Sequence, residues 1–391
     1  MSLEVHSLGC RLNLAESEQL RALLASADDL VVVNSCAVTA EAVRQTRQTI
    51  RRARRARPDA RLLVTGCAAE VERDALSAMP EVDGLIANTA KLDPRAWNVP
   101  APAAPLRPIG YTRGFVQVQN GCDHACTFCV IPQGRGVSRS RPVADVLAEV
   151  ALHLDAGVRE IVLTGVDLTS WGSDLPGTPR LGQLCEAILA RFAALPRLRL
   201  SSVDGAEVDD TLFDLLAAET RMMPHLHLSL QSGDDMILKR MKRRHSRADA
   251  IALVERLRAR RPDLSIGADL IAGFPTESEA MHGQSLSIIQ TLDVVHGHVF
   301  AYSPRPATPA ARMPQVPIAT IRARAAELRR AVAHQRAAWL GRLIGTPLAV
   351  LAERGGTGHS AQFAPVVLPE NTAPGALFSL TPSRVVEGML Q

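Results

Sequence analysis

The sequence predicts an α/β protein with three parts: a small N-terminal parallel α/β domain, a central partial (βα)6 barrel and a small C-terminal β-barrel. Strand-like apolar runs alternate with helical patterns over residues 3–88, and the alternation recurs on a larger scale from residue 115. After about residue 339 short strands follow one another without helices. A chain of 391 residues exceeds what one hydrophobic core usually organises. The expected domains span 1–97, 110–338 and 339–391, with a linker at 98–109.

The N-terminal domain is predicted from four apolar runs with helical patterns between them. The runs are LEVHSL, LVVVN, RLLVT and GLIAN, which begin at residues 3, 30, 61 and 84. The helical patterns lie near residues 14–26, 38–57 and 69–79. Strands joined in this way form parallel sheets. The next segment, NVPAPAAPLRPI, holds four prolines without periodicity and is typical of a linker.

The central region repeats the strand–helix alternation six times. The predicted strands are 115–119, 160–164, 197–201, 225–231, 266–271 and 296–301. The predicted helices are 142–156, 181–194, 208–219, 234–260 and 277–291. Six units indicate a partial parallel barrel rather than a complete eight-unit barrel, and the chemistry of such folds lies at the carboxyl ends of the strands.

A helix rich in arginine and alanine is expected from Pro317 to about Trp339, and the pattern then changes. The predicted strands of the last domain are 347–353, 363–368, 376–380 and 384–390. Glycines at 355, 356 and 358 mark its first turn. This pattern predicts a small β module of about 50 residues.

Composition excludes several classes of protein. Hydrophobic residues make up 47% and charged residues 21%, which is ordinary for a globular protein. No apolar run approaches the roughly 18 residues of a membrane span, and the start lacks the basic and apolar regions of a signal peptide. We therefore expect a cytoplasmic protein without a membrane association. Seven cysteines in a reducing compartment indicate metal binding or catalysis rather than disulfides.

One set of three cysteines follows the first strand of the barrel region. These loop cysteines are Cys122, Cys126 and Cys129, with C-x3-C-x2-C spacing. Three thiolates this close can bind three corners of a [4Fe-4S] cluster and leave the fourth iron open. A structural zinc site would need a fourth ligand, and His124 inside the loop is the nearby candidate. The spacing favours the cluster.

A second set lies at the ends of three predicted strands. These strand-end cysteines are Cys10, Cys36 and Cys67, each one or two residues beyond a strand-like run and before a helical segment. If the strands are parallel neighbours, the three sulfurs meet at one edge of the sheet. The alternative is three independent buried cysteines. Cys185 lies on the apolar face of a predicted helix, so we expect it to be structural.

These features together resemble the radical S-adenosylmethionine (SAM) methylthiotransferase family over nearly the whole chain. The matching motifs are GCRLN, NSCAVT, TGC, CDHACTFC with its trailing GRGVSRSRP, TGVDLTSWG, LHLSLQSGDD and LIAGFPTE. Within the family, LKRMKRRHSR and HVFAYSPRPATPAARMP are most similar to the subgroup that acts on threonylcarbamoyladenosine beside the tRNA anticodon. The C-terminal module then resembles a TRAM domain, an RNA-binding barrel.

The resemblance implies an enzyme with two [4Fe-4S] clusters and two uses of SAM. One SAM methylates sulfur held at the N-terminal cluster, and another supplies the 5′-deoxyadenosyl radical that removes hydrogen from C2 of the adenine. The implied partners are tRNA and a flavodoxin-like or ferredoxin-like reductant. The family resemblance leaves the oligomeric state open.

SAM is expected to lie across the carboxyl ends of the barrel strands. The expected contacts are Thr164 and Gly165, Ser201 and Asp204, Ser229 and Gln231, and the turn formed by Gly273, Phe274 and Pro275. For each of these residues a structural role in a turn or in the barrel interior is the alternative.

Three basic clusters are candidates for contact with RNA phosphates. They are seven arginines between Arg44 and Arg57; Arg135, Arg139 and Arg141; and Lys239, Arg240, Lys242, Arg243 and Arg244. A solvated helix face is the alternative for the first cluster. The histidines at 225, 227, 296 and 298 recur at period two and are expected to be barrel packing or polar lining rather than metal ligands.

Other functions remain open at this point. Within the family, the substrate alternatives are isopentenyladenosine in tRNA and an aspartate of a ribosomal protein. An alternative of another class is an RNA-binding protein whose cysteines hold metal for folding without catalysis. Two open sets of three cysteines favour the enzyme.

Overall fold

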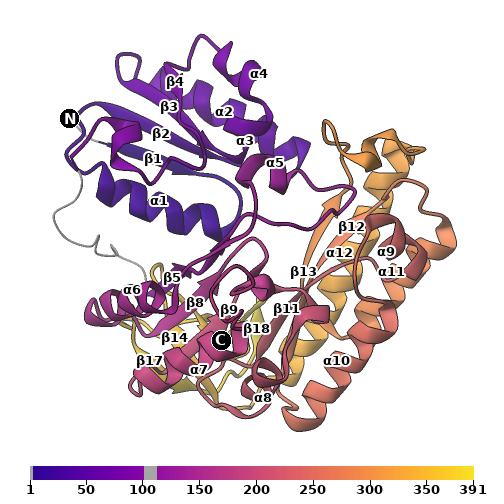
Figure 1. Ribbon diagram of the computed structural model, residues 1–391. Coiled ribbons are helices and arrows are strands. Elements are labelled where there is room, and N and C mark those ends of the chain that lie inside the picture. Colours follow the sequence, from indigo (N-terminus) through magenta and orange to yellow (C-terminus); the bar gives the residue numbers. More distant parts are fainter. Residues whose placement is uncertain (1–2, 101–111) are drawn as a thin grey trace. The chain divides into compact units, whose positions relative to one another are not determined.

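The computed structural model describes residues 3–100 and 112–391 (Figure 1). The described residues form two compact units. The first unit contains residues 3–100, 119–139 and 303–312. The second contains residues 112–118, 140–302 and 313–391. Most of the predicted linker, residues 101–109, lies outside the described residues.

The sheet of the first unit confirms the predicted parallel α/β arrangement. Its strands pair in parallel in the order β1-β2-β3-β4. These strands are β1 (Glu4–Ser7), β2 (Leu30–Ser35), β3 (Arg61–Gly66) and β4 (Gly84–Leu85). The helices between them are α1 (Arg11–Leu23), α2 (Ala40–Ala56), α3 (Cys67–Val71) and α4 (Arg73–Ser77). The helical pattern near 69–79 is thus two short helices.

Helices cover both faces of this sheet, which explains the apolar run of β2. Val31 and Val33 pack with Val43 of α2 on one face, whereas Val32 packs with Leu20 of α1 on the other. Successive side chains of a strand point to opposite faces, so a strand buried on both faces needs an uninterrupted apolar sequence. Figure 1 shows α1 and α2 on opposite sides of the sheet.

The segment 119–139 brings the loop cysteines into the first unit. It contains β6 (Gln119–Asn120) and α5 (Ile131–Arg135). Helix α5, which the sequence did not predict, packs against α3. The packing is close, because a Cβ added to Gly134 would lie 3.1 Å from Cys67 Cβ. The 3-10 helices η1 (Pro94–Trp97) and η4 (Pro309–Arg312) complete the unit.

The second unit confirms the six predicted parallel strands. They are β5 (Arg113–Gln117), β8 (Glu160–Thr164), the pair β9 (Arg197–Leu200) and β10 (Ser202–Val203), β11 (His225–Gln231), β12 (Ser265–Ala272) and β13 (Val294–Ala301). The sheets run β5-β8-β9 and β10-β11-β12-β13, with parallel pairing throughout. The third predicted strand, 197–201, corresponds to β9, and β10, which begins after Ser201, belongs to the other sheet.

Helices alternate with these strands, as expected for strand–helix units. They are α6 (Val143–Asp155), α7 (Leu181–Arg191), α8 (Asp210–Ala218), α9 (Asp235–Met241), α10 (Arg247–Arg260), α11 (Glu279–Thr291) and α12 (Ile318–Arg342). The short elements are β7 (Arg139–Ser140), η2 (Leu168–Ser170) and η3 (Gly205–Glu207). No helix in the described part of the chain has the length and apolarity needed to cross a membrane.

The prediction of one helix over 234–260 was wrong. Lys242 adopts a left-handed φ of 59° and ends α9, because a residue in this conformation cannot continue a helix. Ser246 then begins α10 through a capping box with Asp249. The continuous helical pattern conceals this break, since Lys242 is not a residue that usually signals a helix end.

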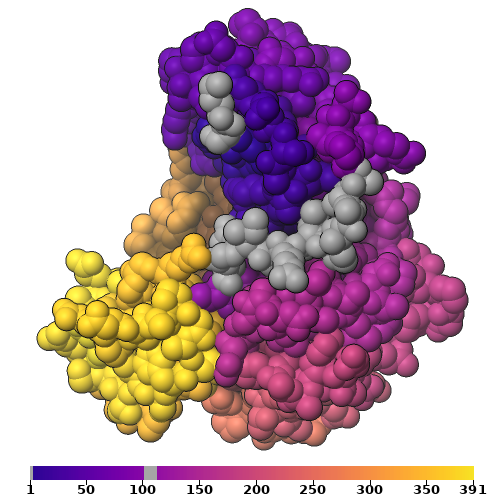
Figure 2. Space-filling view, turned by 90° about the vertical axis from the view of Figure 1, so that its left-hand side faces the viewer, coloured from indigo at the N-terminus to yellow at the C-terminus, as the bar shows by residue number. Residues whose placement is uncertain are grey.

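The predicted C-terminal β module is a six-stranded sheet. Its strands are β14 (Leu348–Ala352), β15 (Thr357–Ser360), β16 (Pro365–Val367), β17 (Leu377–Leu380), β18 (Val385–Val386) and β19 (Met389–Leu390). The strand order is β17-β14-β15-β16-β19-β18. Val350, Val366 and Leu390 belong to its own small core. Figure 2 shows this last part of the chain in yellow as a compact body.

The turn between β15 and β16 closes the amino-terminal end of the barrel. The ring centroid of Phe363 lies 5.3 Å from that of His225 and 5.7 Å from that of His296. The guanidinium carbons of Arg113 and Arg199 lie 5.3 and 4.9 Å from the same ring. These neighbours come from four strands, and two of them are the first residues of β5 and β11. Phe363 therefore fills the lumen where the strands begin.

Candidate active site

The loop cysteines lie between β6 and α5, where backbone groups surround them. The N–H groups of His124 and Ile131 donate to the sulfurs of Cys122 and Cys129, each over 3.4 Å. A backbone hydrogen bond of 3.1 Å from Cys122 to Gly136 joins the two ends of the loop. Hydrogen bonds to sulfur are one means by which proteins tune iron–sulfur clusters. The loop thus offers three thiols in a setting suited to a cluster.

Local sequence explains why this loop folds back on itself. Gly121 has a φ of +74°, and a Cβ added there would lie 1.9 Å from the carbonyl oxygen of Val137, so only glycine fits. Asp123 accepts a hydrogen bond of 3.0 Å from the backbone N–H of Ser138. The Gln119 side chain donates to Ser138 Oγ at 2.9 Å. Both ends of the loop are therefore fixed.

The strand-end cysteines converge through the parallel register of the first sheet. Ser35 of β2 is opposite Gly66 of β3, so Cys36 and Cys67 are the next residues on two paired strands. Cys10 follows β1 and is the N-cap residue of α1. A Cβ added to Gly9 would lie 2.7 Å from Cys36 Sγ, which places the Cys10 segment beside Cys36. All three cysteines are thus at the carboxyl edge of the sheet.

Burial and nearby charge act in opposite directions on these thiols. Burial raises the pKa of Cys36 to about 11 and also raises the pKa of Cys67. The positive charges of Arg135 and Lys91 oppose the rise for Cys67. Metal ligands must be thiolates, so binding a cluster releases protons and is favoured by the positive charge.

A buried ion-pair network that sequence reasoning missed lies beside both sets of cysteines. Arg135 donates to Glu16 Oε1 at 2.8 Å and to Asn13 Oδ1 at 2.5 Å, and Lys91 donates to Glu16 Oε2 at 2.5 Å. Arg135 is 3% exposed, Lys91 2% and Glu16 0%. The expectation that Arg135 meets RNA phosphates was therefore wrong, because its guanidinium is enclosed by protein.

Most of the other predicted basic residues also pair with the protein's own acids. On α2 the pairs are Arg44–Glu41, Arg47–Glu72, Arg51–Glu81, Arg54–Asp83 and Arg57–Asp29. Arg141 pairs with Glu149, and Arg243 pairs with Asp204. Exposed cations that can meet phosphates include Arg52, Arg55, Arg139, Lys239 and Lys242.

The predicted SAM contacts lie at the carboxyl ends of successive barrel strands. Thr164 is the last residue of β8, Ser201 separates β9 from β10, and Gln231 ends β11. Ser201 Oγ is buried and has no hydrogen-bond partner among the described residues. Gly165 directly follows Thr164, and Gly273 directly follows β12.

The turn after β12 has more structural constraints than the sequence indicated. Gly273 has a φ of +70° and donates its N–H to Glu277 at 2.9 Å. Phe274 is fully buried and packs edge-to-face with Tyr302, with ring centroids 5.7 Å apart. Pro275 is buried as well. Any contact of this turn with adenine would therefore involve its backbone or a rearranged side chain.

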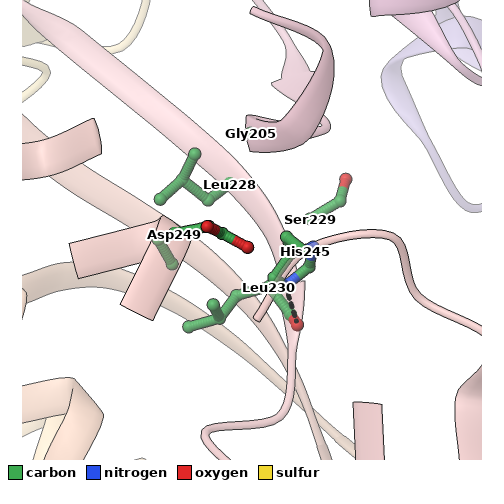
Figure 3. A pocket seen from close by; sticks show the side chains of 7 residues that line it. Gly205, Leu228, Ser229, Leu230, His245 and Asp249 are labelled. Carbon is green, nitrogen blue, oxygen red and sulfur yellow. Dashed lines mark hydrogen bonds between the residues drawn. The ribbon is translucent and has the colours of Figure 1, made fainter. Parts of the chain in front are cut away.

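Ser229 lines a small pocket that Figure 3 shows, and Asp204 directly precedes Gly205, another of its lining residues. The pocket is lined by Gly205, Leu228, Ser229, Leu230, His245, Asp249 and Ala250. Burial would raise the pKa of Asp204, but His245, whose Nδ1 lies 3.7 Å from the carboxylate, and the charge of Arg243 outweigh it and hold that pKa well below its usual range. Asp204 is therefore an ionised carboxylate with protein partners.

The period-two histidines of β11 and β13 contact one another and Asp269. Asp269 Oδ1 lies 3.2 Å from His227 Nε2 and 3.1 Å from His298 Nδ1. The rings of His225 and His296 meet edge-to-face at 5.2 Å. Cys185 lies on α7 and is fully buried in the hydrophobic core, as expected.

The donor chemistry of both cysteine sets fits iron–sulfur clusters. Each set offers three sulfurs, and none of the seven cysteines forms a disulfide. Three protein ligands leave one iron of a [4Fe-4S] cluster open to a further ligand. The loop cysteines are half-buried, whereas Cys36 and Cys67 are buried and Cys10 is exposed.

Two family models match this chain, one over the N-terminal sheet and one over the barrel. The model of the radical SAM superfamily matches residues 116–287. The model of the uncharacterized protein family UPF0004 matches residues 2–87. Membership of the radical SAM superfamily implies SAM and a [4Fe-4S] cluster as cofactors.

Two curated relatives identify the family more closely. The threonylcarbamoyladenosine tRNA methylthiotransferase MtaB of Rickettsia prowazekii is 43% identical, covering 99% of this chain and 96% of the relative. A tRNA-2-methylthio-N(6)-dimethylallyladenosine synthase of Cereibacter sphaeroides is 35% identical, covering 90% and 88%. The chain belongs to the radical SAM methylthiotransferase family.

A solved structure supports the fold independently. The radical SAM methyltransferase TsrM from Kitasatospora setae, with cobalamin and a [4Fe-4S] cluster bound, has a TM-score of 0.58 and 17% identity. The match covers 80% of this chain and 77% of that chain. At this identity the likeness shows the fold alone.

Proposed function

We propose that this chain is a tRNA methylthiotransferase that converts threonylcarbamoyladenosine beside the anticodon into its 2-methylthio derivative. The 43% identity to the threonylcarbamoyladenosine enzyme of R. prowazekii, over nearly all of both chains, supports this substrate. The observation that carries the sulfur chemistry is the presence of two separate sets of three cysteines within one compact unit.

In this proposal the loop cysteines hold one [4Fe-4S] cluster and the strand-end cysteines hold a second. When bound, the clusters and SAM supply the radical that removes hydrogen from C2 of the adenine and the sulfur that replaces it. The protein's own task is to keep the two sets of thiols separate, each with three sulfurs directed to one cluster. The N–H donors to Cys122 and Cys129 support this assignment for the loop.

Nine residues at the carboxyl ends of the barrel strands are the proposed contacts of SAM. They are Thr164, Gly165, Ser201, Asp204, Ser229, Gln231, Gly273, Phe274 and Pro275. The buried hydroxyl of Ser201, which has no protein partner in the described structure, supports a role in binding a polar ligand. The low pKa of Asp204 keeps a negative charge at the same edge.

The remaining features of the proposal concern the surroundings of the reaction. The domains are 1–97, 110–338 and 339–391, joined by the linker 98–109, and the C-terminal sheet contributes to tRNA binding as a TRAM-like module. A flavodoxin-like or ferredoxin-like protein supplies electrons. The enzyme works in the cytoplasm, because its substrate is tRNA.

Anaerobic reconstitution tests the catalytic proposal. The full chain is loaded with iron and sulfide, assayed for both, and then given dithionite and SAM. We expect about eight irons per chain, as two [4Fe-4S] clusters require, and release of 5′-deoxyadenosine. Bound zinc without SAM cleavage would instead support the metal-stabilised RNA-binding protein.

A second experiment tests the substrate. The reconstituted enzyme is given tRNA bearing threonylcarbamoyladenosine or, separately, tRNA bearing dimethylallyladenosine. Mass spectrometry of the digested nucleosides should show a methylthio product only with the first tRNA. The second tRNA is included because the C. sphaeroides dimethylallyladenosine enzyme is 35% identical to this chain. Product only with the second tRNA would overturn the proposed substrate and leave the family chemistry intact.

A further inference from the structure

The buried network of Arg135, Glu16 and Lys91 has an unbalanced charge. It contains two cations and one carboxylate, and all three side chains are at most 3% exposed. Burying a charge without a counter-charge is costly. Burial would raise the pKa of Glu16, but Lys91 and Arg135 outweigh it and lower that pKa, so the carboxylate is ionised. Burial lowers the pKa of Lys91, and the charge of Glu16 opposes this effect. With Lys91 protonated, the network holds a net charge of about +1 that needs an anion nearby.

The segment that bears Arg135 lies beside one of the strand-end cysteines. A Cβ added to Gly134, the residue before Arg135, would lie 3.1 Å from Cys67 Cβ. A cluster held by three thiolates keeps negative charge at the same place, so the net +1 complements it.

Hydrogen bonds from the same network fix the segments that bear the strand-end cysteines. Asn13, which accepts from Arg135, donates to the carbonyls of Leu8 at 2.7 Å and Ser35 at 3.0 Å. These carbonyls lie two residues before Cys10 and one residue before Cys36. Asn88 donates to the carbonyl of Gly134 at 2.5 Å and lies 3.9 Å from the sulfur of Cys67.

Arg135 also belongs to the segment that follows the loop cysteines. It ends α5, which begins two residues after Cys129, and its Nη1 donates to Asn120 Oδ1 at 2.8 Å, just before the loop. One side chain thus joins the loop segment to α1 and, through Asn13, to the ends of β1 and β2.

We propose that Arg135, together with Lys91, is a positioning residue for the N-terminal cluster: it fixes the strand-end cysteines relative to the loop cysteines and supplies the positive charge that raises the reduction potential of the N-terminal cluster. This inference rests on the second cluster of the proposed function. A cation beside a cluster stabilises the reduced, more negative state, so its removal should make the potential more negative.

The test measures the reduction potential of the N-terminal cluster alone. The background is the full chain with Cys122→Ala, Cys126→Ala and Cys129→Ala, reconstituted anaerobically and titrated by electron paramagnetic resonance. Arg135→Gln and Lys91→Gln each reduce the network charge to about zero and should shift the potential to more negative values. Arg135→Lys keeps the charge and should leave the potential within error of the background protein.

A matched double variant separates charge from loss of packing. Glu16→Gln with Lys91→Gln removes a buried ion pair but keeps the net +1, so the potential should not move. If Arg135→Gln does not retain iron, Lys91→Gln still gives the measurement, because the Arg135–Glu16 pair remains intact in it. An unchanged potential in Lys91→Gln, or an equal shift in the charge-conserving double variant, would overturn the inference.

The outcome also distinguishes this inference from the proposed function. If the background protein binds no iron at the strand-end cysteines, both the second cluster of the proposed function and this inference are overturned. If the background protein holds a normal cluster but none of the charge variants shifts its reduction potential, the inference alone is overturned.

Discussion

The two sets of cysteines reach similar arrangements by different routes. The loop cysteines lie within eight consecutive residues, and glycine at position 121 with nearby hydrogen bonds shapes their loop. The strand-end cysteines are spread over 58 residues and meet only because β1, β2 and β3 pair in parallel. A loop set depends on local conformation, whereas a strand-end set depends on the whole sheet. The second should therefore be more sensitive to distant changes.

Removing one cysteine from each set should produce the largest and most different effects. Cys126→Ala should abolish both SAM cleavage and methylthio product, because the loop cluster starts the radical chemistry. Cys36→Ala should keep SAM cleavage and lose the product. The measurements are 5′-deoxyadenosine by chromatography and nucleosides by mass spectrometry. Cys185→Ala, which changes a buried thiol outside both sets, is the control and should keep both activities.

Equal loss of SAM cleavage in Cys126→Ala and Cys36→Ala would break the comparison. It would mean that the two sets do not have separate tasks. Full product from Cys36→Ala would have the same consequence for the strand-end set.

Glu16→Ala should destabilise the first unit by about 3–5 kcal/mol, since it leaves Arg135 and Lys91 buried without their carboxylate. The measurement is chemical unfolding of the metal-free protein. The control is Glu18→Ala on the same helix, whose partly exposed pair with Arg21 should contribute about 1 kcal/mol or less. Similar costs for the two variants would contradict a buried network that supports both sets.

Gly66→Ala tests how much the strand-end set depends on the sheet. Gly66 has a φ of +91°, and an added Cβ would lie 2.4 Å from the carbonyl oxygen of Ser35. We expect a loss of about 2–4 kcal/mol and of iron from the strand-end site. Gly157→Ala has a similar φ of +83° with nothing within 4 Å, so it should cost only about 1–2 kcal/mol and keep all iron. Normal iron content in Gly66→Ala would show that the strand-end set tolerates a disturbed sheet.

The pH dependence of stability in the second unit provides a reference measurement that involves neither set of cysteines. Burial lowers the pKa of His296 to about 3, below the value of about 6.5 in an unfolded chain. The unfolded state thus binds the proton first, and stability present above pH 6.5 is lost as the pH falls toward 3. Between pH 7 and 5 the loss should be about 2 kcal/mol.

The control for this pH effect is a histidine on the surface. His296→Gln should reduce the loss of unfolding free energy between pH 7 and 5 by about 2 kcal/mol, whereas His334→Gln, at an exposed position of α12, should not. An identical pH dependence in both variants would assign the acid sensitivity to other groups.

Much of the fold was predictable because its signals are local and repeated. The run LVVVN indicated a strand buried on both faces, and the structure places Val32 and Val33 against different helices. The convergence of Cys36 and Cys67 followed from assuming parallel neighbours, which the register of β2 and β3 confirms. The six barrel strands were found for the same reason, apart from the short strand β10, which lies beyond the third predicted strand.

The misses concern features that depend on tertiary contacts. Arg135 looked like a surface cation because its sequence neighbours are basic and polar. The packing of α5 against α3 and the contacts with Glu16 and Asn13 of α1 bury it. One signal was available: Glu16 lies four residues from both Leu12 and Leu20 on the buried side of α1. An acid at such a position usually requires a buried cation, although the sequence does not say which one.

The ring of Phe363 closes the barrel where its strands begin. A ligand of the lumen would therefore reach it from the carboxyl ends of the strands, where the proposed SAM contacts lie.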